Sequence, residues 1–298
     1  MALQSVIETH DLTKVYSGFM RPDVLAVDRL DLTVGRGEVF GLLGPNGSGK
    51  TTTTKLLLGL IFPTGGSATV LGRPAGDIAA KARIGFLPEE SYLYRFLNAE
   101  ETLDFYGRIF GMPRAVRRRR IDELIELVGL QQARRRALRG YSKGMSRRIG
   151  IAQALINDPD LIFLDEPTSG LDPIGRLEVK QLILRLKELG KTIMLCTHLL
   201  PDVQDVCDRI AILNNGRLCK QGSLDDLLMM KDRTQLTVDG LTDQQRDDLR
   251  RFLADRGHDE VTMVHPYDTL SSLFMTIIEA EQQPSRSERR PEDDGSEP

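Results

Sequence analysis

The chain has 298 residues, with 40 basic and 43 acidic side chains and a formal net charge of −3. This length suits one large domain plus an appendage, and the near balance of charge gives no general attraction to nucleic acid. Three cysteines (Cys196, Cys207 and Cys219) lack metal-site spacing and form an odd set, which argues against a disulfide framework and favours a reducing cytosol. No apolar run approaches the ~20 residues that cross a bilayer, and no secretion signal is visible, so we expect any membrane role to come through a partner.

Hydrophobic periodicity and turn residues predict the following elements in chain order. The first half should hold short strands within 3–43, strands at 66–72 and 82–88, and helical spacing over about 98–157. The second half should hold a buried strand at 160–167, a helix at 172–190, a buried strand at 192–198 and a hairpin around Asn215-Gly216 at 209–222. The helix at 172–190 is amphipathic. Its buried face is expected to hold Val179, Leu182, Ile183 and Leu186, and Gly190 would end it. Apolar strands that alternate with helices predict a parallel sheet with covered faces.

The residue pattern of the sequence changes after Gly222. A capping box at Thr242 and Gln245 predicts the start of a helix, with strand-like and apolar stretches on either side. We therefore expect a small α/β appendage over 233–281. The end of the chain, 282–298, is polar, charged and proline-bearing, which predicts disorder.

A glycine-rich stretch, "GLLGPNGSGKTTTTKLL" (41–57), is the first motif that carries chemistry. It fits G-x-x-x-x-G-K-[ST] at Gly44, Gly49, Lys50 and Thr51, between a short apolar strand (38–43) and a helix (50–60). In such a loop the backbone N–H groups cradle phosphates, the lysine reaches the β- and γ-phosphates, and the hydroxyl holds Mg²⁺. An ordinary strand–turn–helix connection explains a glycine or two, but not Lys50-Thr51 at this spacing.

An acidic pair ends the strand "LIFLDEP". Ligands collect at the carboxyl ends of strands in open α/β sheets, so Asp165 can hold Mg²⁺ and Glu166 can polarise an attacking water. Taken alone, the pair could equally end a strand and cap a helix.

The segment "YSKGMSRRIGIAQALINDPDLIFLDEPTSGLDP" (141–173) strongly resembles the ATP-binding cassette (ABC) family. It carries the family's signature loop (142–145), its aspartate–glutamate strand and its D-loop (169–172). "CTHLLPDVQDVCDRIAIL" (196–213) resembles the switch region, and "LTKVYSG" (12–18) the segment that contacts adenine. The resemblance covers about residues 3–228. It implies a P-loop ATPase domain over 1–232 with a mainly parallel sheet, an N-terminal antiparallel β subdomain and a helical subdomain over about 98–157.

The resemblance also implies ATP and Mg²⁺ as cofactors and a role for each matching residue. Phosphate-binding positions are Gly44, Pro45, Asn46, Gly47, Ser48, Gly49, Lys50, Thr51 and Thr52. Tyr16 would stack on adenine, Ser142, Gly144 and Asp172 would contact nucleotide across a dimer, and Thr51, Asp165 and Glu89 would hold the metal. Glu166 would activate water, with His198 sensing the γ-phosphate. The alternatives are an edge-strand tyrosine at 16, a strand end at 198, and a helix cap and turn at 142–144.

Two departures from the family pattern concern the site. Glu89 stands where the family usually has glutamine, in "GFLPEE", so its metal and coupling role is open to the alternative of a solvated loop acid. The signature reads "YSKGM" rather than "LSGGQ". With "LPEE" and "TLSSLFMTIIE", it resembles cassettes that serve separately encoded permeases in drug, antibiotic, lipid and polysaccharide export.

Two arginine-rich runs, 114–120 and 133–139, are expected mainly on a solvated face, with anionic lipid or RNA as alternatives. The leading interpretation is the ATP-hydrolysing subunit of an exporter, a homodimer on the cytoplasmic face of the cell membrane that drives an integral membrane permease and binds no nucleic acid. The alternatives are a soluble ABC ATPase with a macromolecular partner and, less favoured because it needs no signature loop, a P-loop kinase.

Overall fold

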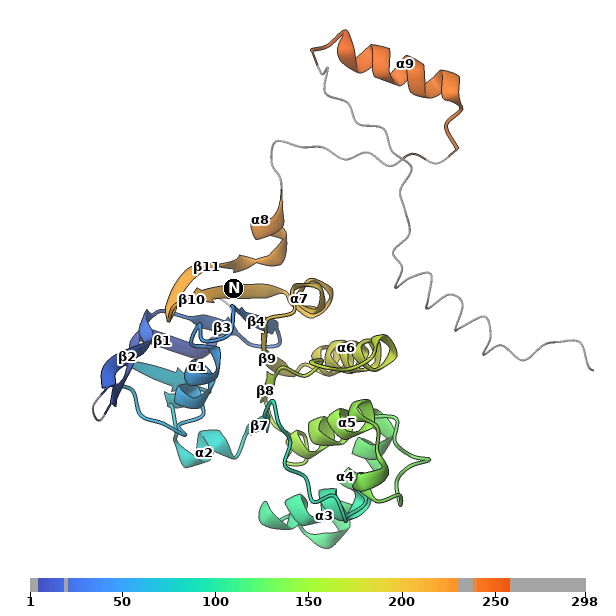
Figure 1. Ribbon diagram of the computed structural model, residues 1–298. Helices are drawn as coiled ribbons and strands as arrows, with labels where there is room; N and C mark the ends of the chain where they lie inside the picture. Colours follow the sequence, from blue (N-terminus) through green and yellow to red (C-terminus); the bar gives the residue numbers. More distant parts are fainter. Residues whose placement is uncertain (1–4, 19–20, 230–237, 239, 258–298) are drawn as a thin grey trace, which may run out of the picture. The chain divides into compact units, whose positions relative to one another are not determined.

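The computed structural model of the chain describes residues 5–18, 21–229, 238 and 240–257 (Figure 1). The chain divides into two compact units, 1–229 and 230–298. The second unit contains helix α9 (Asp243–Ala254), which begins with the capping box predicted at Thr242 and Gln245. The remainder of the predicted 233–281 appendage and the predicted disordered tail at 282–298 lie outside the described residues.

A six-stranded sheet forms the centre of the first unit. Its order is β11-β10-β4-β9-β8-β7; neighbouring strands run parallel except β11, which closes the edge antiparallel to β10. The strands are β4 (Val39–Leu43), β7 (Ile84–Leu87), β8 (Leu161–Asp165), β9 (Thr192–Thr197), β10 (Arg209–Asn214) and β11 (Arg217–Ser223). Every residue of β4, β8 and β9 is buried, as expected for parallel strands covered on both faces. The predicted parallel sheet and the predicted hairpin are confirmed.

A second, antiparallel sheet comes from the N-terminal part of the chain. Its strands are β1 (Ser5–Gly18), β2 (Arg21–Leu30), β3 (Thr33–Gly35), β5 (Gly65–Val70) and β6 (Arg73–Pro74). It shares one apolar core with α1 (Lys50–Leu57) and one face of the central sheet, and Leu12, Leu30, Leu57 and Phe163 lie in that core. The antiparallel subdomain implied by the family resemblance is therefore present.

The helix predicted over 50–60 stops at Leu57. Gly59 takes φ +61, and a Cβ there would lie 2.2 Å from the Cα of Gly76. The chain therefore leaves the helix early, because its backbone must pass close to the turn that contains Gly76.

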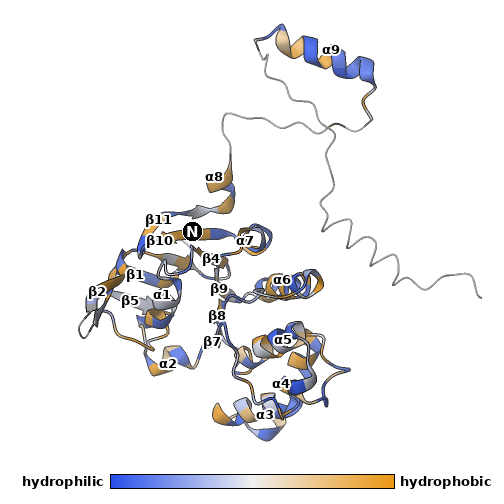
Figure 2. Cartoon of the chain, in the orientation of Figure 1, coloured by the Kyte–Doolittle hydropathy of each residue, from blue (hydrophilic) through white to orange (hydrophobic). Residues whose placement is uncertain are grey.

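Helices cover the other face of the central sheet. They are α5 (Lys143–Ala154), α6 (Pro173–Glu188) and α7 (Leu200–Val206), while α3 (Ala99–Ile109) and α4 (Arg114–Leu127) pack on α5. The chain also forms the shorter helical turns α2 (Ile78–Lys81), η1 (Leu138–Gly140) and α8 (Leu224–Leu228). Hydrophobic and hydrophilic residues both occur along α6 (Figure 2). Its four predicted core residues are buried, and Gly190 follows the last helical turn with φ +77. The helical spacing predicted from 98 to 157 is confirmed by α3, α4 and α5.

The two arginine-rich runs lie on α4 and in the loop before α5, and only part of them is solvated. Arg117 is buried, and its Nε donates to Asp104. Arg134 pairs with Glu100 and Asp122. Most arginines of the two runs are exposed, which agrees with the prediction of a mainly solvated face, and intramolecular ion pairs take up part of the positive charge. Within the described part of the chain, no helix is long and apolar enough to span a bilayer.

Candidate functional site

The glycine-rich loop runs from the end of β4 to the start of α1. A Cβ on Gly44 would lie 2.3 Å from both the carbonyl oxygen of Leu213 and the hydroxyl of Ser48. Gly49 has φ +102, and a Cβ there would lie 2.6 Å from the carbonyl oxygen of Ala26. These close approaches require glycine, and they hold the loop tightly curved at the N-terminus of α1.

Lys50 is buried, and its ammonium group contacts only backbone carbonyls in the described structure. Its Nζ donates to Gly44 O at 2.7 Å and Pro45 O at 3.1 Å. The Ser48 hydroxyl is also buried, with no hydrogen-bond partner among the described residues. A buried cation without a carboxylate partner, an unsatisfied hydroxyl and a helix N-terminus together form a site suited to an anion.

Asp165 and Glu166 face this loop from the carboxyl end of β8. Each is only 6% exposed. Burial, together with the negative charges of Glu89 and Glu166, raises the pKa of Asp165 to about 6, against the opposing positive charges of Arg147 and Lys50. Burial beside two other carboxylates thus disfavours the charged form of Asp165, which a cation bound there would favour.

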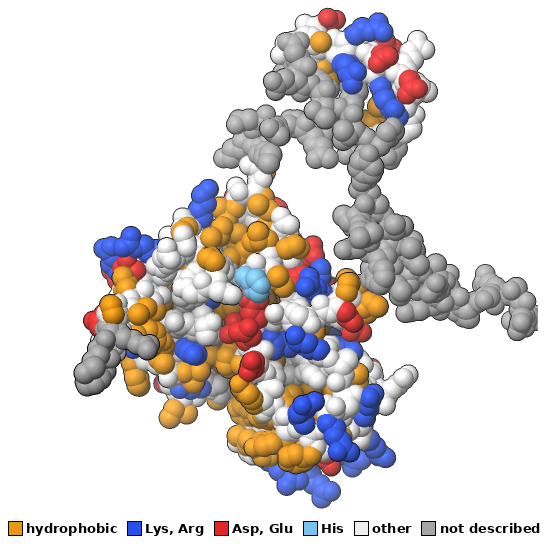
Figure 3. Space-filling view, viewed as in Figure 1, with side chains coloured by type: hydrophobic (Ala, Val, Ile, Leu, Met, Phe, Trp, Pro, Cys, Tyr) orange, Lys and Arg blue, Asp and Glu red, His pale blue; other side chains and the backbone are white. Residues whose placement is uncertain are grey.

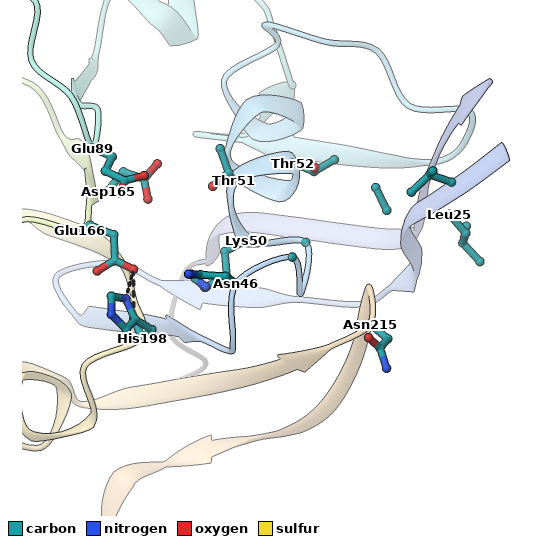
Figure 4. Close-up of a pocket in the computed structure, with 14 residues that line it drawn as sticks. Leu25, Asn46, Lys50, Thr51, Thr52, Glu89, Asp165, Glu166, His198 and Asn215 are labelled. Atoms are coloured by element: carbon teal, nitrogen blue, oxygen red, sulfur yellow. Dashed lines mark hydrogen bonds and ion pairs between the residues drawn. The ribbon is translucent and has the colours of Figure 1, made fainter. Parts of the chain in front are cut away.

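Glu166 is held by contacts on every side. Its φ of +47 is a left-handed conformation that costs roughly 1–2 kcal/mol for a residue with a Cβ. Its N–H donates to Cys196 O at 2.8 Å. Its carboxylate accepts from the Thr197 hydroxyl at 3.0 Å and the His198 N–H at 3.1 Å, and lies 2.7 Å from His198 Nδ1 (Figure 4). The surroundings therefore fix a strained residue in one orientation.

A pocket of about 420 Å³ lies between the glycine-rich loop and the acidic strand end. Ten of the predicted site residues line it: Asn46, Gly47, Gly49, Lys50, Thr51, Thr52, Glu89, Asp165, Glu166 and His198. Figure 4 shows Glu89 beside Asp165 and His198 beside Glu166, opposite the loop and the start of α1. Residues separated by up to 152 positions in the sequence therefore form one site.

Comparison with known proteins decides the family. The family model described as "ABC transporter" matches residues 27–169. An ABC transporter ATP-binding protein of Nostoc sp. is 54% identical over 228 residues, 75% of this chain and 68% of that protein. One of Synechocystis sp. is 48% identical over 286 residues, 92% of this chain and 80% of that protein. The chain belongs to the family of ABC transporter ATP-binding proteins. It is an ATP-binding protein and an ATPase.

Two further comparisons agree. The Nod factor export ATP-binding protein I of Cupriavidus pinatubonensis is 42% identical over 229 residues, 76% of this chain and 69% of that protein. A dimeric ATP-binding cassette, solved in a post-hydrolysis state with ADP and Pi, superposes with a TM-score of 0.66 at 26% identity, over 73% of this chain and 98% of that chain. The predicted fold class of this ABC ATPase is confirmed.

The pocket of this ABC ATPase also includes residues that sequence reasoning missed. Val24, Leu25 and Ala26 of β2 line it, as does Asn215, which the sequence marked only as a turn. Tyr16 does not line it. Tyr16 lies on β1 directly opposite Val24, half exposed, with Lys14 Nζ 5.3 Å from its ring centroid. The contact of Tyr16 with adenine stays a prediction. The β2 residues were missed because the register of the β1–β2 pair decides which residues reach the pocket.

Ser142, Gly144 and Asp172 lie outside the pocket of their own chain. Ser142 accepts a hydrogen bond from the N–H of Met145 and caps α5, while Asp172 accepts from Gly175 and caps α6. The first turns of the two helices are adjacent, since a Cβ on Gly144 would lie 3.7 Å from the Cα of Gly175. The three residues therefore share one surface, and their contact with nucleotide stays a prediction.

Three predicted residues of the glycine-rich loop, Gly44, Pro45 and Ser48, shape the loop without lining the pocket.

The predicted metal ligands, Thr51, Asp165 and Glu89, do line the same pocket. Among the described residues, however, no group of three or more His, Cys, Asp or Glu side chains is arranged to hold a metal ion by itself. Mg²⁺ is usually bound by one or two carboxylates together with substrate phosphates and water. The residues present therefore fit a metal that arrives with a nucleotide rather than a permanent one.

We predict that Asp165→Asn stabilises the nucleotide-free protein at alkaline pH. Because the pKa of Asp165 is raised from 3.8 to about 6, its contribution to stability is fully present below about pH 4 and is lost as the pH rises through 6. At pH 8 the ionised carboxylate costs about 3 kcal/mol, at ~1.4 kcal/mol per pKa unit. Melting temperatures in metal-free buffer should show a gain for the variant at pH 8 that disappears towards pH 4. An equal gain at both pH values would contradict this explanation.

Proposed function

We propose that this ABC ATPase powers export through a separate membrane permease, on the cytoplasmic face of the cell membrane. The relatives include proteins named for Nod factor export and a probable multidrug ABC transporter protein of Escherichia coli, 38% identical over 226 residues. The observation that carries the proposal is the convergence of Lys50, Asp165, Glu166 and His198 on one pocket, because it supplies an anion site, a metal site and a base at the same place.

In this proposal the loop and Lys50 bind the β- and γ-phosphates of ATP. Thr51, Asp165 and Glu89 would hold Mg²⁺, which neutralises charge on the phosphates. Glu166 accepts a proton from the attacking water, and its bonds to Thr197 and His198 keep the carboxylate oriented. His198 is on the pocket wall, 44% exposed in its side chain, where its ring can contact the γ-phosphate.

We infer that two copies of the chain form the complete site. Ser142 and Asp172 share a surface outside the pocket, where they can meet the nucleotide bound by a second copy. Lys143 Nζ lies over Gly170, since a Cβ there would be 2.0 Å from it, so the signature and D-loop segments are joined within the chain. The dimeric neighbour with ADP and Pi supports this arrangement.

An exposed aromatic cluster supports contact with a permease. The ring centroid of Tyr94 lies 5.7 Å from that of Phe96 and 5.6 Å from that of Phe105, and Phe96 is 73% exposed. Figure 3 shows hydrophobic side chains gathered at the bottom of the view, on the lobe that contains α3. Exposed apolar patches mark interaction sites. The cluster begins five residues after Glu89, so a partner bound there is linked to the pocket by a short segment.

We predict that Glu166→Gln keeps ATP binding and slows hydrolysis by ~10²–10⁴-fold, the usual contribution of a general base. Binding should persist because the loop and Lys50 are unchanged. A filter-binding assay and a single-turnover assay measure the two effects separately. The variant should also form ATP-dependent dimers in size-exclusion chromatography. Near wild-type turnover would remove Glu166 from the proposed mechanism.

We predict that a Tyr94→Ala/Phe96→Ala variant retains basal ATPase activity but loses stimulation by the permease in reconstituted membranes, because the cluster lies outside the pocket. Leu189→Ala, at an exposed apolar position after α6, serves as the matched control and should be stimulated normally. Equal stimulation of the double variant and wild type would rule out this docking surface.

Copurification tests the alternative function. If the chain copurifies with a soluble macromolecule and no membrane protein, the soluble ABC ATPase alternative is favoured.

A further inference from the structure

Arg147 makes a set of hydrogen bonds that the family motifs do not account for. It lies in α5, five residues after Ser142, and is 9% exposed. A guanidinium group has five N–H donors, and all five have an acceptor. Nε donates to Pro167 O at 3.1 Å, Nη1 to Pro88 O at 2.8 Å and Glu89 O at 2.7 Å, and Nη2 to Asp165 O at 2.8 Å and Glu166 O at 2.5 Å.

All five acceptors are backbone carbonyls, and they come from only two segments. One segment, 88–89, directly follows β7 and carries Glu89. The other, 165–167, ends β8 and carries the acidic pair. Among the described residues, no salt bridge joins Arg147 to a carboxylate, although the negative charges of Asp165, Glu89 and Glu166 act on it, and burying a charge is costly unless it is paired and hydrogen-bonded. The contacts are therefore specific to the shape of the guanidinium, and a lysine with three donors on one atom cannot reproduce them.

The carbonyl of Glu166 is the most informative of these acceptors. Glu166 is left-handed, with φ +47, and such a residue persists only where its surroundings over-determine it. Cys196 O fixes its N–H, Thr197 and His198 fix its carboxylate, and Arg147 fixes its carbonyl. The Ser169 N–H also donates to this carbonyl, at 3.2 Å. Arg147 therefore supplies the side-chain contact on this side of Glu166 and ties it to α5.

We propose that Arg147 is a positioning residue for ATP hydrolysis. It fixes the backbones of Glu89 and Glu166 so that both carboxylates face the nucleotide pocket. Because Arg147 and Ser142 lie on the same helix end, a shift of α5 that brings Ser142 to a second copy's nucleotide also moves the support of both acids. The inference rests on the proposed roles of Glu166 and Glu89.

Arg147→Lys is the first test, and Arg148→Lys is the matched control. Arg148 is the next residue of α5 and also donates to backbone carbonyls, at Val128 and Gly129, and pairs with Glu178, all away from the pocket. We expect Arg147→Lys to lower kcat by about 10–100-fold, the scale of a misplaced catalytic group. Its affinity for a fluorescent ATP analogue should stay close to wild type. Arg148→Lys should cost as much in melting temperature and little in kcat.

A double-variant experiment separates positioning from general loss of structure. If Arg147 acts through Glu166, adding Arg147→Lys to Glu166→Gln should change the residual single-turnover rate by less than about twofold. An equal loss in both backgrounds would overturn the inference, as would wild-type kcat in Arg147→Lys. Arg147→Gln provides a second variant if the lysine variant is not recovered folded. Full activity of Glu166→Gln alone would instead show that the proposed base is wrong, so the two failures are distinguishable.

Discussion

Two buried carboxylates at the end of β8 are the constraint on which the rest of the site depends. Both side chains must stay close to a phosphate-binding loop, where burial and the negative charges of Glu89 and Glu166 disfavour the charged form of Asp165. The positive charges of Lys50 and Arg147 partly offset this effect at Asp165. Hydrogen bonds from Thr197 and His198 hold the Glu166 carboxylate. In the proposed mechanism, a nucleotide that arrives with a divalent cation completes the charge balance. The acidic strand end is thus electrostatically unfavourable by itself, and the proposed substrate complex relieves this.

Much of this architecture could be predicted from the sequence. The spacing of Gly44, Gly49, Lys50 and Thr51 fixes a loop before a helix, and the apolar run that ends at Asp165 fixes a buried strand with acids at its end. These signals are local, because consecutive residues determine both the strand pattern and the chemistry of the loop. The family motifs then assigned roles to residues whose own chemistry leaves alternatives open, such as Ser142.

Other parts of the site depend on tertiary contacts and have no local signal. An arginine at position 147 looks like any polar residue on an amphipathic helix, and its five acceptors lie in segments about 60 residues before it and 20 after it. The contribution of Val24 and Leu25 depends on the register of β1 and β2, which includes irregular steps. The early end of α1 likewise depends on the approach of Gly59 to Gly76. Packing between distant segments decides all three.

The proposed ATP hydrolysis depends most on a site shared between two chains, and one complementation experiment tests this directly. Glu166→Gln disables hydrolysis in a chain's own pocket, and Ser142→Arg disables the surface offered to its partner, so each homodimer should be inactive. In an equal mixture, each heterodimer has one pocket with Glu166 facing an intact Ser142, and roughly a quarter of the wild-type ATPase rate should return after subunit exchange. No recovery despite demonstrated heterodimers, or full activity of Ser142→Arg alone, would contradict the shared site.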